Sequence, residues 1–355
     1  TNFCRFSGKS LVVSHNCCTF AATNLTTLPI DQRTRVRLFC LYFMQEYQKQ
    51  ALDTPDLLSI LKERGLIVSN EKAAIKTLSI ISYFRLASYF RPLEADKQTH
   101  RFRQGCTLEQ VLALYEFDTS LRDLVFSSTR RIEVALRTRL NHHFSRRHNP
   151  FWFTQVELAT DGHLYVENLS NVDRELHRTK EDFIKEHFAR YDKPSFPPAW
   201  KTLETVSFGT LSKLYKNFIS KPDKKAVAED FGLPQHEFLI SWLESLAVLR
   251  NLCAHHARIW NRRYALKPQM PHTLTRGNWL TDFSFPPDKI YPQLCCIAYL
   301  LNSIDENNTF ASDLKTLLVR YPTVDTAAMG FPSARWQQES LWQTDRGAGG
   351  DNPSE

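Results

Sequence analysis

Residues 250–255 read RNLCAH and bring an arginine, an asparagine and a histidine close together in the sequence. Histidine exchanges protons near neutral pH, and arginine offers a permanently charged, planar set of donors that matches a phosphate group. Such a pair can activate a ribose 2′-hydroxyl or protonate a leaving oxygen while the guanidinium neutralises the phosphate. The side chains of Arg250, Asn251 and His255 therefore have chemistry that is sufficient for cleavage of an RNA strand.

The surrounding residues predict that this motif lies on a helix over about 234–257. Asn251 and His255 are four residues apart and so share one face of a helix. Arg250 lies about 140° around the axis from His255 and must reach across with its long side chain. Arg250 also borders the apolar side of the helix, where an unpaired guanidinium is costly, so we expect an anionic group to meet it. The apolar side is formed by Leu239, Trp242, Leu243, Leu246, Leu249 and Cys253.

A structural interpretation of the same residues stays open. Arg250 can pair with an internal carboxylate such as Glu244 or Glu204. His255 can simply occupy the carboxyl end of the helix, where a positive charge is favoured. Spacing alone does not separate this interpretation from catalysis.

A second arginine and histidine pair, Arg137 and His142, shows how easily the looser spacing arises. Thr138 follows this arginine, where the fuller motif has an amide or acid. We therefore favour a structural or RNA-contacting role for this pair.

A metal site is not expected. The eight cysteines form no CxxC pair, and neighbouring residues such as Cys253, His255 and His256 on one helix cannot all face one ion. We expect no cofactor, and we place Cys253 in the core.

Two basic stretches suit a phosphate backbone. Residues 130–148 contain six arginines and three histidines against one acid, and residues 245–281 contain no acid. Trp260 and Tyr264 are interleaved in the second stretch as candidates for base stacking. A solvated helix face remains the alternative for a basic run. The predicted RNA-binding residues are Arg130, Arg131, Arg137, Arg139, His142, Arg146, Arg147, Arg258, Arg262 and Arg263.

Length and composition indicate an ordinary globular protein. The chain has 355 residues, of which 42% are hydrophobic and 23% charged, with a net charge of +7. This length allows one large domain or two unequal ones. Because no apolar run approaches the roughly 18 to 20 residues of a membrane helix and no signal-peptide pattern occurs, we expect no membrane partner and a cytoplasmic location.

Helical periodicity after residue 50 predicts an all-α bundle. Thr107 and Gln110 form a capping-box pattern that begins a long helix ending near Asn149-Pro150. Further helices are expected at about 163–191, 199–220, 234–257, 288–304 and 308–320. We divide the chain into an N-terminal extension (1–50), a small helical unit (51–104), a large helical domain (105–325) and a disordered tail (326–355).

RNLCAH resembles the RNxxxH motif of HEPN ribonucleases, and the chain over roughly 51–325 is similar to the abortive-infection Abi family of the AbiD/AbiF type. The supporting stretches are SYFRLASYFRP at 82–92, YEFDTSLRDLVFSSTRRIEVALRTRL at 115–140 and PPAWKTLETVSFGTLSKLY at 197–215. The resemblance implies a HEPN-like helical bundle with a small N-terminal helical unit. It also implies that Arg250 and His255 are catalytic, with Asn251 orienting the site or contacting RNA.

The resemblance further implies a role in phage defence, a homodimer with a composite site, and association with a structured small noncoding RNA. Three hypotheses follow. The first is a metal-independent endoribonuclease that leaves a 2′,3′-cyclic phosphate and a 5′-hydroxyl. The second is a module that holds a structured noncoding RNA without cutting it, and the third is a protein whose helices mediate assembly in a defence pathway.

Overall fold

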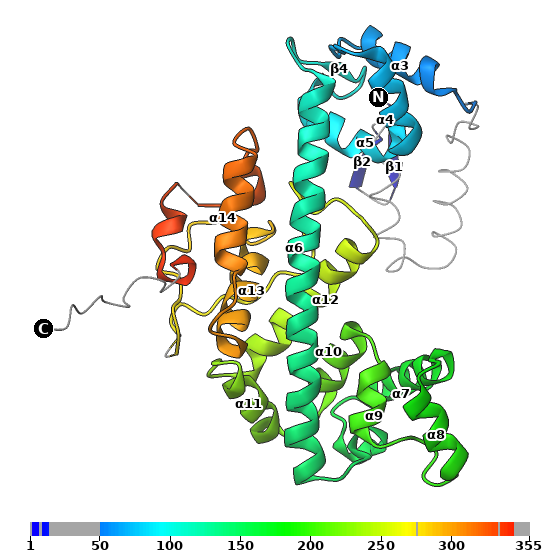
Figure 1. Ribbon diagram of the computed structural model, residues 1–355, viewed down its shortest axis with the longest axis vertical. Helices are drawn as coiled ribbons and strands as arrows, with labels where there is room; N and C mark the ends of the chain where they lie inside the picture. The colour runs from blue at the N-terminus through cyan, green and yellow to red at the C-terminus, as the bar shows by residue number, and fades with distance from the viewer. Residues whose placement is uncertain (1, 7–8, 14–49, 275, 333, 344–355) are drawn as a thin grey trace, which may run out of the picture. The chain divides into compact units, whose positions relative to one another are not determined.

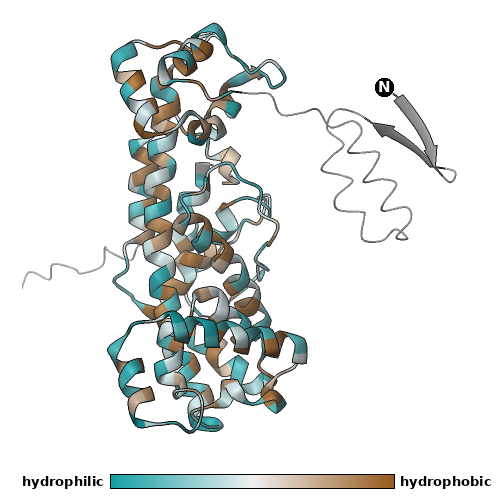
Figure 2. Cartoon of the chain, turned by 90° about the vertical axis from the view of Figure 1, so that its right-hand side faces the viewer, coloured by the Kyte–Doolittle hydropathy of each residue, from teal (hydrophilic) through white to brown (hydrophobic). Residues whose placement is uncertain are grey.

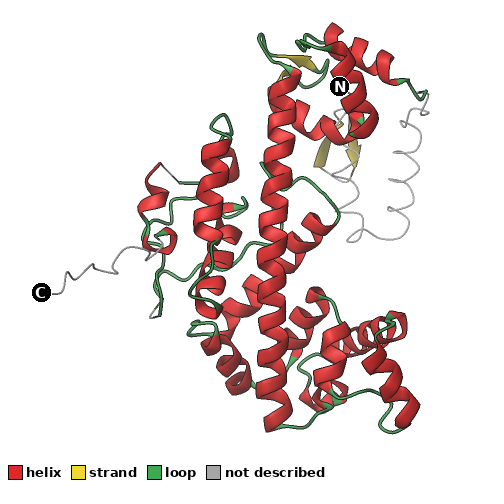
Figure 3. Cartoon of the chain, viewed as in Figure 1, coloured by secondary structure: helices red, strands yellow, loops and turns green. Residues whose placement is uncertain are grey.

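The computed structural model describes residues 2–6, 9–13, 50–274, 276–332 and 334–343. Helices dominate these residues, and strands occur only in two short pairs among them (Figure 3). The prediction of an all-α protein is therefore confirmed. The chain divides into two compact units, Thr1–Leu57 and Leu58–Glu355, and the finer boundaries expected from the sequence remain predictions.

The described part of the first unit contains a β-hairpin that the sequence analysis missed. Strand β1 (Asn2–Phe6) pairs antiparallel with β2 (Lys9–Val13), with Asn2 opposite Val13 and Phe6 opposite Lys9. The rest of the predicted N-terminal extension, apart from residue 50, lies outside the described residues.

Three short helices and a second hairpin precede the longest helix. Side-chain oxygens start two of the helices, because Asn70 Oδ1 accepts the amide of Ala73 at 3.0 Å and Ser82 Oγ accepts that of Arg85 at 3.3 Å. The elements are α3 (Thr54–Glu63), α4 (Glu71–Ile80), α5 (Tyr83–Phe90), the 3-10 turn η2 (Arg91–Leu93), and the paired strands β3 (Glu94–Asp96) and β4 (Arg101–Phe102).

Helix α6 (Leu108–Leu140) is the longest element of the described chain, and it begins as predicted. Thr107 and Gln110 form the capping box with both reciprocal bonds present. A π-helical turn, η3 (Asn141–Ser145), continues directly from α6, and the helical conformation ends at Arg147, close to the predicted end near Asn149-Pro150.

The helices after α6 are shorter and more numerous than the periodicity predicted. The segment predicted as one helix over 163–191 is two helices, and so is the segment over 199–220, because Val206 adopts an extended conformation and Ser207 caps a new start. Helix α11 was missed. The observed helices are α7 (Gly162–Arg178), α8 (Asp182–Arg190), α9 (Ala199–Thr205), α10 (Phe208–Asn217), α11 (Lys221–Asp230), α12 (His236–Ala254), α13 (Tyr291–Ile304) and α14 (Phe310–Arg320), with 3-10 turns η4 (Trp152–Thr154) and η5 (Val156–Leu158) before them.

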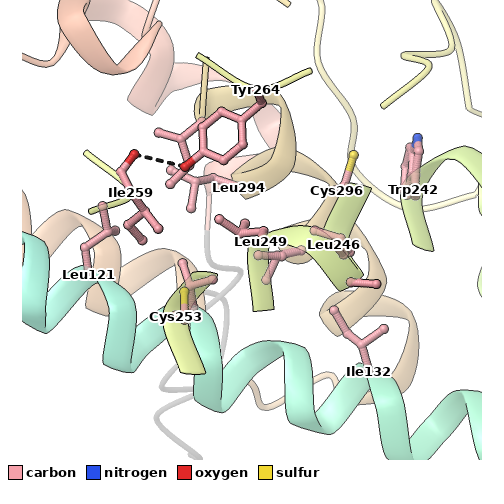
Figure 4. Close-up of a cluster of buried hydrophobic side chains, with 14 of the residues drawn as sticks. Leu121, Ile132, Trp242, Leu246, Leu249, Cys253, Ile259, Tyr264, Leu294 and Cys296 are labelled. Atoms are coloured by element: carbon pink, nitrogen blue, oxygen red, sulfur yellow. Dashed lines mark hydrogen bonds between the residues drawn. The ribbon is translucent and has the colours of Figure 1, made fainter. Parts of the chain in front are cut away.

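Helix α6 is the element against which the larger unit packs (Figure 1). Helices α10, α12, α13 and α14 all contact it. Figure 4 shows part of this packing, in which Leu121 and Ile132 of α6 belong to one buried cluster with Leu246 and Leu249 of α12 and Leu294 of α13. Hydrophobic and hydrophilic residues alternate around the long helix (Figure 2), as expected for an element with both packed and exposed sides. No helix of the described residues is long and apolar enough to cross a membrane.

The prediction of a disordered tail does not hold for residues 326–343. These residues form three 3-10 turns, η6 (Ala327–Met329), η7 (Ala334–Gln338) and η8 (Ser340–Trp342). Trp342 is fully buried, and its indole nitrogen donates to the hydroxyl of Tyr291 at 3.2 Å. Lys315 Nζ donates to the Trp342 carbonyl at 2.6 Å. Trp336 is also buried and lies 5.3 Å from Trp342 between ring centres, so two tryptophans of the predicted tail complete the core around α13.

Replacing Trp342 with alanine should lower the free energy of unfolding by about 3–5 kcal/mol, because it leaves a large cavity beside Tyr291. Urea unfolding followed by circular dichroism would measure this loss. Trp200, which is 51% exposed, provides the matched control, and Trp200→Ala should cost less than about 1 kcal/mol. Equal stability of Trp342→Ala and the unchanged protein would contradict the packing of the tail.

Candidate functional site

The predicted motif lies at the carboxyl end of α12, and the backbone there forms a closed cap. His255 is the last residue with near-helical geometry, and His256 takes a left-handed conformation with φ of 54°. The amide of Ala257 donates to the Leu252 carbonyl at 2.8 Å, and that of His256 donates to the Cys253 carbonyl at 3.0 Å. This bond pattern usually has glycine in the left-handed position. The residues that follow the helix must therefore be held firmly to keep a histidine there.

Asp118 of α6 fixes the residues that follow the helix. One carboxylate oxygen accepts the backbone amides of Ile259 (3.2 Å) and Trp260 (2.6 Å), just beyond the cap. The other oxygen accepts the hydroxyl of Tyr89 at 2.6 Å and pairs with Arg122. Burial raises the pKa of the Asp118 carboxyl, whereas the bonds from Tyr89 and Arg122 lower it. A single fully buried carboxylate thus joins α5, α6 and the chain after the motif.

Helix α5 reinforces this junction with two arginine bonds to backbone carbonyls. Arg85 donates to the carbonyl of His256 at 2.8 Å, and Arg258 donates back to the carbonyl of Ser88 at 2.9 Å. Burial lowers the pKa of Arg258. The end of α12 is consequently fixed against α5 on both sides of the cap.

Arg250 meets the anionic partner that its position on the helix predicted. The partner is Glu133 of α6, whose Oε2 lies 3.5 Å from the Arg250 guanidinium. The alternatives, Glu204 and Glu244, do not take this role. Glu204 is exposed, and Glu244 instead pairs with Lys216 at 2.6 Å.

The guanidinium of Arg250 is held loosely. It donates to Asn251 Oδ1 at 3.3 Å and lies 5.6 Å from the ring centre of Phe126. Its buried Nε has no hydrogen-bond partner within the described part of the chain, and neither has Oε2 of Glu133. The side chain keeps 24% of its surface exposed, so a ligand can reach it.

Arg137 shares Glu133 with Arg250 but is bound much more tightly. It pairs with Glu133 Oε1 at 2.6 Å and donates to the carbonyls of Leu203 (2.7 Å) and Val206 (3.0 Å). These carbonyls lie at the end of α9, where a cation is favoured. Arg137 therefore has a structural role, and one carboxylate faces two guanidiniums, which leaves the cluster with a net positive charge.

His255 lies apart from this cluster. Its imidazole is exposed, and none of its side-chain atoms bonds to another described residue. The structure joins the side chains of Arg250 and Asn251 by a hydrogen bond. His255 is joined to Asn251 only by its backbone amide, which donates to the Asn251 carbonyl at 3.0 Å. The predicted convergence of three side chains at one helix end is thus realised for two of them within one chain.

Carboxylates neutralise much of the predicted basic surface. Arg131 pairs with Asp305, Arg147 with Asp223, and Arg263 with Asp288. The guanidinium of Arg139 stacks 3.7 Å from the ring centre of Phe231, and burial lowers its pKa. These partners compete with an RNA phosphate for the same guanidiniums, and the RNA-binding roles of these residues remain predictions.

Fewer of the predicted RNA-binding residues remain open to a ligand. Arg130, His142 and Arg146 are exposed and have no carboxylate partner in the described residues. Among the described residues, Arg262 bonds only to the carbonyl of Arg258, at 3.4 Å.

Trp260 and Tyr264 are not available for base stacking, contrary to the prediction. They are 3% and 5% exposed. The Tyr264 hydroxyl donates to the Ile259 carbonyl at 2.9 Å inside the core that Figure 4 shows.

The described residues contain no group of three or more side chains able to hold a metal ion. Cys253 is in the core, as expected, and burial raises the pKa of its thiol to about 12. A buried thiol with a raised pKa is a poor nucleophile at neutral pH.

The sequence analysis missed Asp118 and Glu133 as residues that position the motif. Each is an acid four residues before an arginine on α6, Arg122 and Arg137 respectively. Both acids lie on the apolar side of the predicted helix, where an acid is unusual and requires partners. This position could have identified them from the sequence.

Comparison with known families fits this architecture. The model of the family described as Abi-like protein matches residues 76–261, a range that runs from α4 through the motif and ends just after the residues held by Asp118. The match covers more than half of the chain. Searches of curated proteins and of solved structures gave no match.

The chain therefore belongs to the Abi-like protein family. Membership supports a role in abortive infection, a defence against phage.

Replacing Asp118 with asparagine should lower the free energy of unfolding by about 3 kcal/mol, because Arg122 then lies buried without its charge partner. Amide hydrogen exchange of Ile259 and Trp260 should also become faster. Asp123→Asn, at an exposed position of the same helix, is the control and should change neither quantity. Unchanged exchange in Asp118→Asn would refute the role given to this carboxylate.

Glu133→Gln should lower the free energy of unfolding by about 3 kcal/mol, since two guanidiniums lose their shared counter-charge in a mostly buried setting. Chemical unfolding measures the effect. Glu244→Gln removes the carboxylate of a more exposed pair and should cost less than about 1 kcal/mol. Similar losses in the two variants would show that Glu133 does not organise the cluster.

Proposed function

We propose that this Abi-like protein is a metal-independent endoribonuclease of the HEPN type, and that it belongs to the AbiD/AbiF group. The observation that supports the proposal most is the state of Arg250. It is a partly exposed guanidinium, next to an amide and loosely paired with a single carboxylate, on a helix whose end carries an exposed histidine. A group in that state can exchange Glu133 for a phosphate without unfolding the site.

The roles follow from the chemistry of the three side chains. His255 transfers the proton, Arg250 neutralises charge on the phosphate in the transition state, and Asn251 orients the guanidinium or the substrate. The ribose 2′-oxygen attacks the phosphorus and loses its proton, while the bond to the 5′-oxygen breaks and that oxygen gains a proton. The products are a 2′,3′-cyclic phosphate and a 5′-hydroxyl.

A homodimer would complete the site. Within one chain Arg250 pairs with Glu133 of α6, whereas the exposed side chain of His255 has no hydrogen bond to another described residue. Two copies that meet at the ends of their α12 helices would place the arginine of one beside the histidine of the other. This arrangement supports the expected composite site.

The second candidate is a module that binds a structured small noncoding RNA without cutting it. The observation that favours it is the exposed set Arg130, His142 and Arg146, which has no carboxylate partner in the described part of the chain. Binding through such residues would weaken strongly with salt and would be unaffected by His255→Ala.

Purified protein incubated with labelled total RNA in EDTA should cut the RNA, and the new ends should be cyclic phosphates and 5′-hydroxyls. His255→Ala and Arg250→Ala should each reduce the rate at least about 100-fold, because each removes a group that acts in the transition state. His177→Ala, at an exposed histidine of α7, is the matched control and should keep the full rate.

Retained RNA binding with no cleavage by any variant would exclude a constitutive nuclease and favour the binding module. Purified protein that carries no RNA, judged from its ultraviolet absorbance ratio, and that binds none would favour the third hypothesis, an assembly role.

A further inference from the structure

Phe84, the second residue of α5, has an unusual position for a phenylalanine. Its side chain is 86% exposed, more than any other large hydrophobic side chain of the described residues. Ile80, four positions earlier at the end of α4, is 74% exposed. Neither side chain contributes to the core, so the fold does not explain why an aromatic ring stands here.

The surroundings of Phe84 lead directly to the motif. The next residue, Arg85, binds the carbonyl of His256, and Ser88 accepts the guanidinium of Arg258. Phe84 therefore directly precedes the residue of α5 that bonds to the cap of α12, and it lies one helical turn before the carbonyl that accepts the Arg258 bond.

The charge around this ring favours a polyanion. Residues 72–93 contain no Asp or Glu, and neither do residues 245–281. The two stretches meet through the bonds of Arg85 and Arg258. The carboxylate at their junction, Asp118, is fully buried and engaged by four donors, so it does not oppose an anion at the surface.

An exposed aromatic ring on a segment that carries cations and no acids is a combination that binds unpaired nucleotides. The cations attract the phosphates, and the ring stacks against a base regardless of its identity. A base-paired helix keeps its bases stacked on one another and offers no free base face to such a ring.

We infer that Phe84 is the stacking platform for an unpaired base of the RNA that reaches the motif, and that the substrate is therefore single-stranded at this point. The inference rests on the proposed RNA function and names its substrate class. In this scheme α5 recognises single-stranded RNA, and the end of α12 carries the residues that cleave it.

Binding of a short single-stranded RNA tests the inference. The probe carries 2′-O-methyl riboses, which cannot be cleaved, and one 2-aminopurine whose fluorescence is quenched by stacking. Phe84→Ala should raise the dissociation constant about 5- to 150-fold and abolish the added quenching. Phe84→Tyr keeps a ring and should bind as the unchanged protein does. Phe188→Ala removes another exposed phenylalanine, on α8, and should have no effect.

The possible outcomes distinguish failure of the Phe84 platform from failure of the proposed RNA function. The platform and the proposed RNA function are both supported if Phe84→Ala binds the single-stranded probe more weakly than the unchanged protein but binds a duplex probe equally well. Single-stranded RNA bound equally well by Phe84→Ala overturns the platform and leaves RNA binding intact. Failure of the unchanged protein to bind either probe overturns the proposed function and the platform together. If Phe84→Ala instead dissociates a dimer in sedimentation while the affinity for RNA stays the same, the ring is an interface between two copies.

Discussion

The carboxylate of Asp118 is the interaction on which the arrangement of the motif depends. It is fully buried, and its two oxygens accept bonds from α5, from its own helix and from two consecutive backbone amides after α12. A buried charge is tolerated only when its bonding capacity is filled, so these groups must arrive together. The left-handed histidine at the end of α12 is held in place by this requirement rather than by its own preference.

The sequence predicted the elements whose signals are local. The start of α6 follows from the pairing of Thr107 with Gln110, and α12 follows from apolar residues at helical spacing. The sequence did not predict the break at Val206, because the same apolar spacing continues across it and a serine cap is a weak signal within a helix-like pattern. Helix α11 was missed because it is highly charged and only a few of its residues are buried.

For the site, as for the fold, the sequence predicted the local features but not the partners from distant segments. Helix geometry required an anion beside Arg250, and the structure has one. Which carboxylate supplies that anion depends on how α6 and α12 cross. The residue spacing within either helix does not determine this crossing. For the same reason, Trp260 and Trp342 were misjudged, since their burial comes from distant segments rather than from neighbours in the sequence.

The spacing of two acids on α6 has a consequence for how this family can vary. Asp118 bonds to the chain after the motif and Glu133 pairs with Arg250, so α6 sets the distance between the two ends of the same site. The fifteen helical steps from Asp118 to Glu133 span about 22 Å and bring both acids to roughly the same side of the helix. Inserting or deleting one residue there would rotate one acid by about 100° relative to the other. Relatives should therefore tolerate substitutions along the outer side of α6 but keep its length between these two positions, while loops elsewhere lengthen and shorten freely.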